Sequence, residues 1–436
     1  MSIKPRIIFG YLFLLSGILI TKSNLLKIFS TYALIQINNI IPIWVLQVSF
    51  IGCGLFLIVF KTDFAQITRF YKSIVAVLFS VLLFFYIANF IASAVLLLDQ
   101  YKHYREFFLA KHEKEFLKLY PKFTSQEVFK LLSETWSRPF EFEPYTLFKE
   151  KSFDGKFVKV SKDGYRLVKD QGPWPPKNEN LNIFIFGGSI AFNYSLPDDE
   201  TIASFIQENL RKDFGDRICI YNFGRGYYFS SQERILFEKL LLAGFVPDIA
   251  LFLDGINEFY FKNDEPLLSD KLSHALNKTN FLLKSDIVRL VKLLVHNKKN
   301  YNGVCVTSEK EKEQTGNSIV NRYLINKKII ESIAVSFNVT PLFIWQPAPT
   351  YNYDLQYHSF AKGGFGRHNF SSYGYKIMDQ IFKSKRISFG NNFLYLADMQ
   401  NNLKYPLYVD KTHYTAHMSE KVAKEIYSFI KGKTKI

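Results

Sequence analysis

The sequence predicts an α/β protein built on a parallel sheet and preceded by an apolar amino-terminal segment. From residue 181 onward, short apolar segments alternate with amphipathic segments of helical spacing, which is the pattern of parallel strands joined by crossover helices. Before residue 99, two long apolar runs carry no charge, as is typical of membrane-spanning helices. A chain of 436 residues has room for two to three structural units.

Residues 1–98 are expected to form a membrane anchor with about three transmembrane helices. The runs 40–60 and 74–98 contain no charged residue, and at about 1.5 Å per residue each is long enough to cross a hydrocarbon core of about 30 Å. The shorter run 7–20 resembles the apolar part of a signal peptide. The sequence TKS that follows it lacks a small-x-small cleavage site, so we expect an uncleaved first span.

Three spans with a cytoplasmic amino terminus would place the carboxy-terminal part outside the cytoplasm. Lys and Arg residues flank the spans on both sides, so the positive-inside rule supports this orientation only in part. The expected localisation is the bacterial inner (cytoplasmic) membrane, as a multi-pass protein with a periplasmic carboxy-terminal domain. The lipid bilayer is thus an expected partner.

Residues 99–180 are expected to form a juxtamembrane helical stalk and a β-hairpin lead-in. Residues 99–145 are rich in Lys, Glu, Phe and Leu at helical spacing, as in KHEKEFLKLY. Residues 155–168 alternate apolar and polar positions around Asp163-Gly164, which indicates a hairpin. The sequence PWPPKNEN then introduces a new unit.

Residues 181–436 are expected to form the α/β domain, with an insertion at about 260–315. The apolar segments predict strands at 182–187, 217–222, 249–254, 340–345 and 393–398. The amphipathic segments between them predict helices at about 200–213, 231–243, 316–336 and 415–431.

Composition excludes several classes of protein. With 48% hydrophobic and 22% charged residues, the chain is not disordered. Three cysteines, Cys53, Cys219 and Cys305, cannot make a disulfide framework or a zinc cluster, and whether Cys219 and Cys305 pair stays open. The formal charge of +16 is not arranged as a basic run interleaved with aromatic residues, so no nucleic-acid partner is expected.

Four segments carry chemically useful residues where parallel strands end, which is where such sheets bind ligands. The sequence FGGS follows the first strand and contains Ser189; NFGRGYYF follows the second and contains Gly226 and Tyr227; DGINEF follows the third and contains Asn257. Taken singly, each segment is equally well explained as a tight turn.

The fourth segment, VDKTHYTAH, precedes the last helix. Asp410 lies three residues before His413, and a carboxylate at this spacing can hold one imidazole nitrogen and leave the other as a base. His413 and His417 are four apart, but Tyr414 stands where a zinc-protease helix has Glu, so no metal is expected. No cofactor is implied either.

Together, these four segments resemble the blocks of the SGNH (GDSL-like) hydrolase family, over about residues 182–431. The chain also resembles the membrane-anchored bacterial branch of this family, in which phrases of the type GGSxxxxxxLPDDETxxxxLQ, PDxxxxxDGxNE and VDxxHYT recur. The resemblance implies a flavodoxin-like three-layer fold. It also implies Ser189 as nucleophile, His413 as general base and Asp410 as the residue that orients the base.

The same resemblance implies an oxyanion hole made from the Ser189 N–H, a backbone N–H of the Gly226/Tyr227 turn, and the side chain of Asn257. The sequence departs from the family in three places. Gly188 stands where many relatives have Asp, Glu258 follows Asn257 where relatives have Asp, and Tyr227 aligns with the usual glycine of the second block. The choice between Gly226 and Tyr227 as donor stays open.

The segment after the fourth strand, YNYDLQYHSFAKGGFGRHNF at 351–370, is rich in aromatic residues. Two interpretations stay open. As a mobile segment near the mouth of the site it would stack on sugar rings or cover an acyl chain; alternatively, it is a long loop packed on its own side chains.

The sequence therefore predicts a membrane-tethered serine esterase or acyl hydrolase, or an acyltransferase, that acts on an ester-bearing glycan or lipid at the cell envelope. The alternative is a catalytically inactive SGNH-like module that binds polysaccharide or scaffolds an assembly. Neither the acyl group, the acceptor nor the oligomeric state follows from the sequence.

Overall fold

The computed structural model describes two compact units. The first comprises Met1–Lys102 and Asp270–Lys299, and the second His103–Ser269 and Asn300–Ile436. The residues that it describes are 5–19, 43–59, 83–95, 113–269, 308–385 and 387–433, with single positions at 69, 73, 76, 77, 80, 81, 304 and 306.

The first unit contains two helices that pack closely at glycines. Helices α1 (Pro5–Leu19) and α4 (Ile43–Val59) approach where Gly10 faces Gly54, and a Cβ at Gly54 would lie 2.8 Å from the Gly10 carbonyl oxygen. Residues 83–95 are also helical. Among the described residues, no helix has both the length and the apolar character needed to cross a membrane. The three predicted spans, parts of which lie outside the described residues, are thus not seen.

The second unit is built on a five-stranded parallel sheet. Its strand order is β6-β5-β7-β8-β9, and all four neighbouring pairs are parallel. Counted along the chain this is the order 2-1-3-4-5 of flavodoxin-like folds, so the predicted α/β fold with a parallel sheet is confirmed. The strands are β5 (Leu181–Gly187), β6 (Ile218–Asn222), β7 (Ile249–Asp254), β8 (Thr340–Trp345) and β9 (Phe393–Tyr395).

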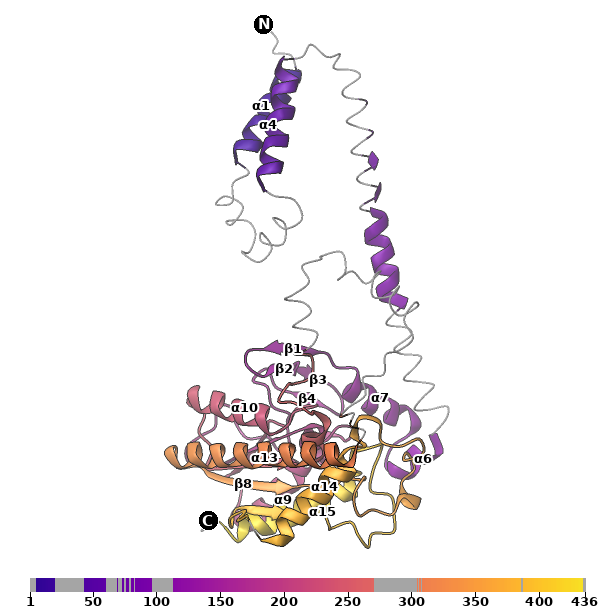
Figure 1. Ribbon diagram of the computed structural model, residues 1–436, viewed down its shortest axis with the longest axis vertical. Helices are drawn as coiled ribbons and strands as arrows, with labels where there is room; N and C mark the ends of the chain where they lie inside the picture. The colour runs from indigo at the N-terminus through magenta and orange to yellow at the C-terminus, as the bar shows by residue number, and fades with distance from the viewer. Residues whose placement is uncertain are drawn as a thin grey trace. The chain divides into compact units, whose positions relative to one another are not determined.

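Helices cover both faces of the sheet. Figure 1 shows α10 and α13 on one side of β8, and α9 and α15 on the other. The residues Met418, Val422, Ile426 and Ile430, four apart, give α15 its buried stripe. The four predicted helices are confirmed, and α14, packed on α13, was not predicted. The bounds are α9 (Ile202–Phe214), α10 (Ser230–Leu242), α13 (Glu309–Ser336), α14 (Ser371–Ser384) and α15 (Ala416–Lys431).

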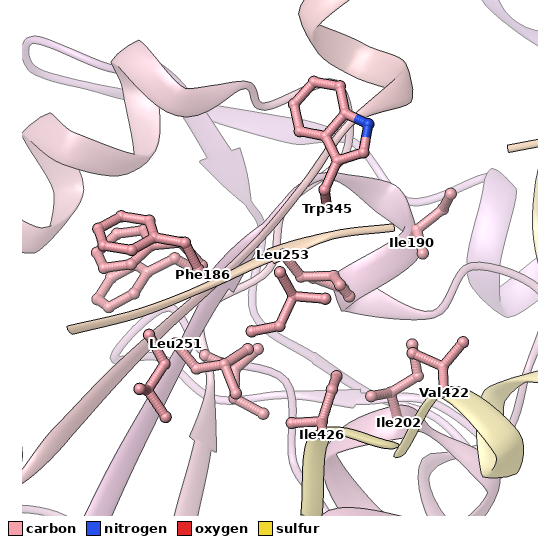
Figure 2. Close-up of a cluster of buried hydrophobic side chains, with 14 of the residues drawn as sticks. Phe186, Ile190, Ile202, Leu251, Leu253, Trp345, Val422 and Ile426 are labelled. Carbon is pink, nitrogen blue, oxygen red and sulfur yellow. The ribbon is translucent and has the colours of Figure 1, made fainter. Parts of the chain in front are cut away.

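The main core lies between the sheet and these helices. Figure 2 shows Leu251 and Leu253 of β7 close to Ile202 of α9 and to Val422 and Ile426 of α15. Every side chain of β7 is buried, because helices cover both faces. Burying one such aliphatic side chain contributes about 1.5–3 kcal/mol, so the central strands are held firmly where their carboxyl ends form the site.

The chain before the sheet folds against it. Its elements are α6 (Glu113–Leu119), α7 (Ser125–Trp136), the antiparallel pair β1 (Phe140–Glu143) and β2 (Leu147–Glu150), and the pair β3 (Phe153–Asp154) and β4 (Lys159–Val160). Phe116, Leu131 and Val158 from this region form a second core with Phe192 and Val409, which flank the site in sequence. The part of the predicted stalk from residue 113 on is therefore a layer of the second unit.

The expected hairpin around Asp163-Gly164 is present as a short turn. The Ser161 N–H donates to the Tyr165 carbonyl oxygen at 2.8 Å, and Gly164 has a φ of +88°, which favours glycine. Val160 forms a bridge with Arg166 across the turn. The pairs β1–β2 and β3–β4 were not predicted.

Arg166 is fully buried and holds the chain that follows the first strand of the sheet. Its guanidinium donates to the carbonyl oxygens of Phe192 (2.6 Å), Asn193 (2.7 Å) and Leu196 (2.5 Å). Its Nε also pairs with Asp198 at 2.9 Å, at the start of η2 (Asp198–Glu200). A guanidinium has five N–H donors and no acceptor, so carbonyl oxygens are the partners it needs when buried.

Three buried carboxyl groups lie beneath the end of β7. Burial raises the pKa of Glu233 on α10, and the negative charges of Asp254 and Glu258 raise it further. Burial likewise raises the pKa of Asp254. Glu258 differs because it faces Arg322 at 3.6 Å and accepts the Ser230 N–H at 2.7 Å. Glu233, which lies beside two other acidic groups in this buried cluster, is thus held as a proton-bearing group in the folded protein.

This cluster predicts a pH-dependent stability. The unfolded chain releases the Glu233 proton near the ordinary pKa of about 4.3, whereas the folded protein keeps it to higher pH. The free energy of unfolding therefore falls as the pH rises above that value. Replacing Glu233 by Gln, which has no proton to lose, is expected to reduce this fall by on the order of 1 kcal/mol between about pH 5 and about pH 8.

Urea denaturation at a series of pH values measures the effect. Glu238→Gln on the same helix is the control, because Glu238 is partly exposed and pairs with Arg234 at 2.6 Å. A Glu233→Gln variant with the pH dependence of the wild-type protein would contradict the assignment.

Candidate active site

Ser189 is placed by a tight turn at the end of β5. It is the first residue of the short helix α8 (Ser189–Phe192) and is partly exposed. Gly187, the last residue of β5, has a φ of +153°, and a Cβ there would lie 2.8 Å from the Leu253 carbonyl oxygen of the neighbouring strand. Only glycine allows this approach, so the FGGS sequence fixes where the serine hydroxyl lies.

His413 reaches the same place from the other end of the chain. Its Nε2 lies 2.8 Å from Ser189 Oγ, although 224 residues separate the two. Its Nδ1 lies 2.8 Å from Asp410 Oδ2 and 2.9 Å from Oδ1. The structure thus brings together Ser189, His413 and Asp410, the three residues singled out from the sequence, in one hydrogen-bonded chain.

The loop before α15 holds Asp410 against the imidazole. The Val409 N–H donates to the His413 carbonyl oxygen at 2.8 Å, which closes the loop. Asp410 Oδ1 accepts the backbone N–H groups of Thr412 and His413, each at 2.9 Å. Burial by itself would raise the pKa of Asp410, but the charge of His413 and these hydrogen bonds outweigh burial and lower this pKa below its ordinary value. Asp410 is therefore an anion that accepts from His413 Nδ1–H.

Two aromatic side chains enclose the His413 ring, and sequence reasoning missed both. The Tyr194 ring stacks on it, with centroids 5.6 Å apart and an interplanar angle of 20°. The Trp136 ring meets it edge-on at 5.2 Å, and Trp136 Nε1 donates to Ser195 Oγ at 3.0 Å. Tyr194 follows the nucleophile segment closely, whereas no local pattern marks Trp136 in the sequence.

Asn257 lies directly against the serine turn. It belongs to the short helix η3 (Ile256–Tyr260) after β7, and its Nδ2 donates one hydrogen to the Tyr228 carbonyl oxygen at 2.8 Å. An amide nitrogen carries two hydrogens, so a second donor remains. A Cβ at Gly188 would collide with Asn257 Nδ2. Glycine is therefore the residue that allows Asn257 to lie this close to the serine turn.

The two candidate backbone donors of the second segment differ in their partners. The Gly226 N–H donates to Glu150 Oε1 at 3.0 Å. Tyr227 has a φ of +65°, and its N–H donates to no group in the described part of the chain. Of the two positions left open by the sequence, only Tyr227 keeps its N–H for a ligand.

Most of the aromatic segment after β8 packs against other parts of the second unit. Tyr353 Oη donates to the Tyr405 carbonyl oxygen at 2.9 Å, and the His358 ring stacks on Tyr408 at 5.1 Å and 9°. Phe360 packs on Phe116 at 5.3 Å. These contacts favour the packed-loop interpretation for this part of the segment, which includes η5 (Leu355–Tyr357).

The end of the segment approaches the site. Arg367 Nη1 of η6 (Gly366–His368) donates to Tyr260 Oη of η3 at 2.6 Å. The His368 ring lies 5.0 Å from that of Tyr260. Burial lowers the pKa of His368 to about 4, and the nearby positive charge of His413 contributes to the shift. His368 is therefore a neutral neighbour of the reacting groups.

Other residues considered from the sequence lie apart from this centre. Within the described residues, no group of three or more His, Cys, Asp or Glu side chains is arranged to hold a metal ion. His417 is exposed on α15 and meets the Tyr405 ring at 5.3 Å. Cys219 is a buried free thiol, while Cys305 lies outside the described residues.

Gly188 provides a test of the Asn257 position. Gly188→Ala places a methyl group where Asn257 Nδ2 lies, so the amide must move away from the serine. Loss of one such donor costs about 10²–10³ in kcat, and we expect a loss of this size for any Ser189-dependent reaction.

Gly432→Ala is the control, since a Cβ there meets nothing nearer than 3.6 Å. Steady-state kinetics and thermal unfolding of both variants measure the effect. Wild-type kcat in a folded Gly188→Ala protein would show that this close contact is unimportant.

Comparisons with known proteins give partial matches. No family model and no curated protein matches the chain. Among solved structures, the acetyl xylan esterase AlAXEase is 13% identical with a TM-score of 0.31, over 57% of this chain and 98% of its own. A putative lipolytic protein of the G-D-S-L family from Desulfitobacterium hafniense is 14% identical with a TM-score of 0.30, over 58% and 99%. The lipase/acylhydrolase from Enterococcus faecalis is 13% identical with a TM-score of 0.32, over 58% and 96%.

Proposed function

We propose that the protein is a serine hydrolase of the SGNH (GDSL-like) type that acts on ester bonds. The observation that carries this proposal is the hydrogen-bonded chain from Ser189 Oγ through His413 to Asp410, with 2.8 Å at each link. A serine hydroxyl is a weak nucleophile until an adjacent base accepts its proton. Asp410 supplies the negative charge that orients this base and stabilises it once protonated.

In the proposed reaction, Ser189 Oγ attacks the ester carbonyl carbon while its proton passes to His413 Nε2. The tetrahedral intermediate collapses when His413 returns that proton to the leaving alcohol, and an acyl-enzyme remains. Water, or the hydroxyl of an acceptor, then attacks the acyl group with His413 again taking the proton, and Ser189 is released. The acceptor decides whether the protein is a hydrolase or an acyltransferase.

The oxyanion of the intermediate requires fixed donors. We assign them to the N–H groups of Ser189 and Tyr227 and to the second hydrogen of Asn257 Nδ2. Three facts support this choice: Ser189 begins a helix, the Gly226 N–H already has an acceptor, and Asn257 packs on Gly188. Each donor of this kind lowers the barrier by about 3 kcal/mol.

Substitution of Ser189 tests the proposal. Ser189→Ala removes the attacking oxygen and leaves the fold unchanged, so hydrolysis of a short-chain aryl ester is expected to fall by at least about 10³. Labelling by a fluorophosphonate, which reacts only with an activated serine, is expected to disappear in the same variant. The rate of the wild-type protein should fall at acid pH, because a protonated His413 cannot accept the serine proton.

Ser332→Ala, at an exposed position of α13, is the control and should label and react like the wild type. The competing function, an inactive module that binds polysaccharide, predicts neither labelling nor hydrolysis in the wild-type protein. A wild-type protein that fails to label, or that fails to hydrolyse the ester, would overturn the enzymatic proposal.

We also propose that the protein is tethered to a bacterial inner membrane, with the site on its periplasmic side. The uncharged runs 40–60 and 74–98 support this proposal. A tether would confine the site near ester-bearing glycans or lipids of the envelope, which are the proposed substrates.

Fractionation of cells that produce the full chain with a carboxy-terminal tag tests the tether. The protein should stay in the membrane pellet after alkaline carbonate extraction. Protease added to spheroplasts should remove the tag. Release of the chain into the carbonate supernatant would contradict the anchor, and a protected tag would contradict the orientation.

A further inference from the structure

Glu150, at the end of β2, is a buried carboxylate that joins three separate parts of the chain. It is 2% exposed. Its Oε1 accepts the Tyr194 hydroxyl at 2.6 Å and the Gly226 N–H at 3.0 Å, and its Oε2 accepts Arg138 Nη2 at 3.1 Å. Removing an ionised carboxylate from water is costly unless several such donors compensate it. The arrangement therefore calls for a reason beyond packing.

Two of the three partners belong to the reacting centre. Tyr194 is the residue whose ring stacks on His413. Gly226 immediately precedes Tyr227, whose N–H is the proposed oxyanion donor. We propose that Glu150 is a positioning residue for the proposed esterase reaction. Its carboxylate holds the Tyr194 ring, which stacks on His413, and the Gly226/Tyr227 turn in fixed positions relative to one another. This inference rests on the proposed function of Ser189, His413 and Asp410.

The geometry around Gly226 supports a rigid link. A Cβ at Gly226 would collide with the Tyr194 hydroxyl and would lie 3.2 Å from Glu150 Oε1. Glycine is thus required for the turn to reach the carboxylate. This hydrogen bond occupies the Gly226 N–H and fixes the peptide between Arg225 and Gly226. The next N–H in the chain, that of Tyr227, donates to no group in the described part of the chain.

Only an ionised carboxylate satisfies this environment. Tyr194 Oη, the Gly226 N–H and Arg138 all act as donors, and a carboxylate accepts at both oxygens. Burial raises the pKa of Tyr194 well above its usual range, and the negative charge of Glu150 raises it further, so the phenol keeps the proton that it donates. A glutamine at this position would turn its NH₂ group toward at least one of these donors.

Glu150→Gln tests the inference, with Glu134→Gln as the matched control. Glu134 is 3% exposed in the same lead-in region, and its carboxylate accepts the backbone N–H groups of Lys156, Phe157 and Val158. Within the described residues, this carboxylate makes no hydrogen bond to Ser189, His413, Asp410, Tyr194 or Gly226. Both variants are expected to unfold at lower urea concentration than the wild type. Only Glu150→Gln is expected to lower kcat, by about 10–100-fold with KM changed less than about threefold.

The pH–rate profile gives a second readout. Moving the Tyr194 ring changes the surroundings of His413, so the acid limb of the profile should shift in Glu150→Gln and stay in place in Glu134→Gln. Equal kcat losses in the two folded variants, or a Glu150→Gln variant with wild-type kcat, would overturn the positioning role. If Glu150 has only a structural role, Glu150→Gln lowers the free energy of unfolding, and kcat does not fall relative to KM.

Tyr194→Phe decides the matter if Glu150→Gln does not fold. It removes the 2.6 Å hydrogen bond but keeps the ring on His413 and the Arg138 pair. A reduced kcat in folded Tyr194→Phe supports the inference, and an unchanged kcat overturns it. A wild-type protein that neither hydrolyses esters nor labels with fluorophosphonate would instead contradict the proposed function, so the two failures are distinguishable.

Discussion

The buried guanidinium of Arg166 is the interaction on which the geometry of the site depends. It binds three carbonyl oxygens between Phe192 and Leu196 and also Asp198. Arg166 itself is fixed to the sheet, because its backbone N–H donates to the carbonyl oxygen of Asn222, at the end of β6, at 2.8 Å. The chain that follows the serine helix therefore has one position relative to two strands. This anchor fixes the backbone on both sides of Tyr194, and the hydrogen bond from its hydroxyl to Glu150 fixes the ring beside His413.

The residues of the candidate site come from the beginning and the end of the sheet domain in sequence, and from the chain that precedes this domain. The serine lies at β5, the strand between β6 and β7 where the strand order reverses direction along the chain, and this is where open α/β sheets bind ligands. The imidazole arrives with the loop before α15. Trp136 and Glu150 come from the lead-in. The smallest folding unit that carries the complete site therefore includes residues 113–180 as well as the sheet.

The sequence predicted the strands of the sheet and selected Ser189, His413 and Asp410, which the structure brings into contact. Central parallel strands such as β7 are continuous apolar runs, and the motif residues follow them directly. The helix α14 escaped prediction because Gly374 lowers its helical propensity; there, glycine lets the helix approach Phe259, where a Cβ would collide. The alternating sequence FEFE of β1 is a period-two signal that could have revealed the first hairpin, but the helical pattern before it obscured that signal. Glu150 meets Gly226 across 76 residues, and no local pattern encodes such a contact.

The position of a free N–H can be derived from the bonds that its neighbours make. In the second segment, the sequence pattern left open whether the Gly226 N–H or the Tyr227 N–H is the oxyanion donor. Glu150 distinguishes them, because its buried carboxylate accepts the Gly226 N–H, whereas the Tyr227 N–H has no acceptor among the residues that the structure describes. Tyr227 tolerates its φ of +65° because the hydrogen bonds on either side, from Gly226 to Glu150 and from Asn257 to Tyr228, hold the turn. Under the proposed function, a tyrosine can serve at this position, because an oxyanion would require only the backbone N–H and would make no demand on the side chain.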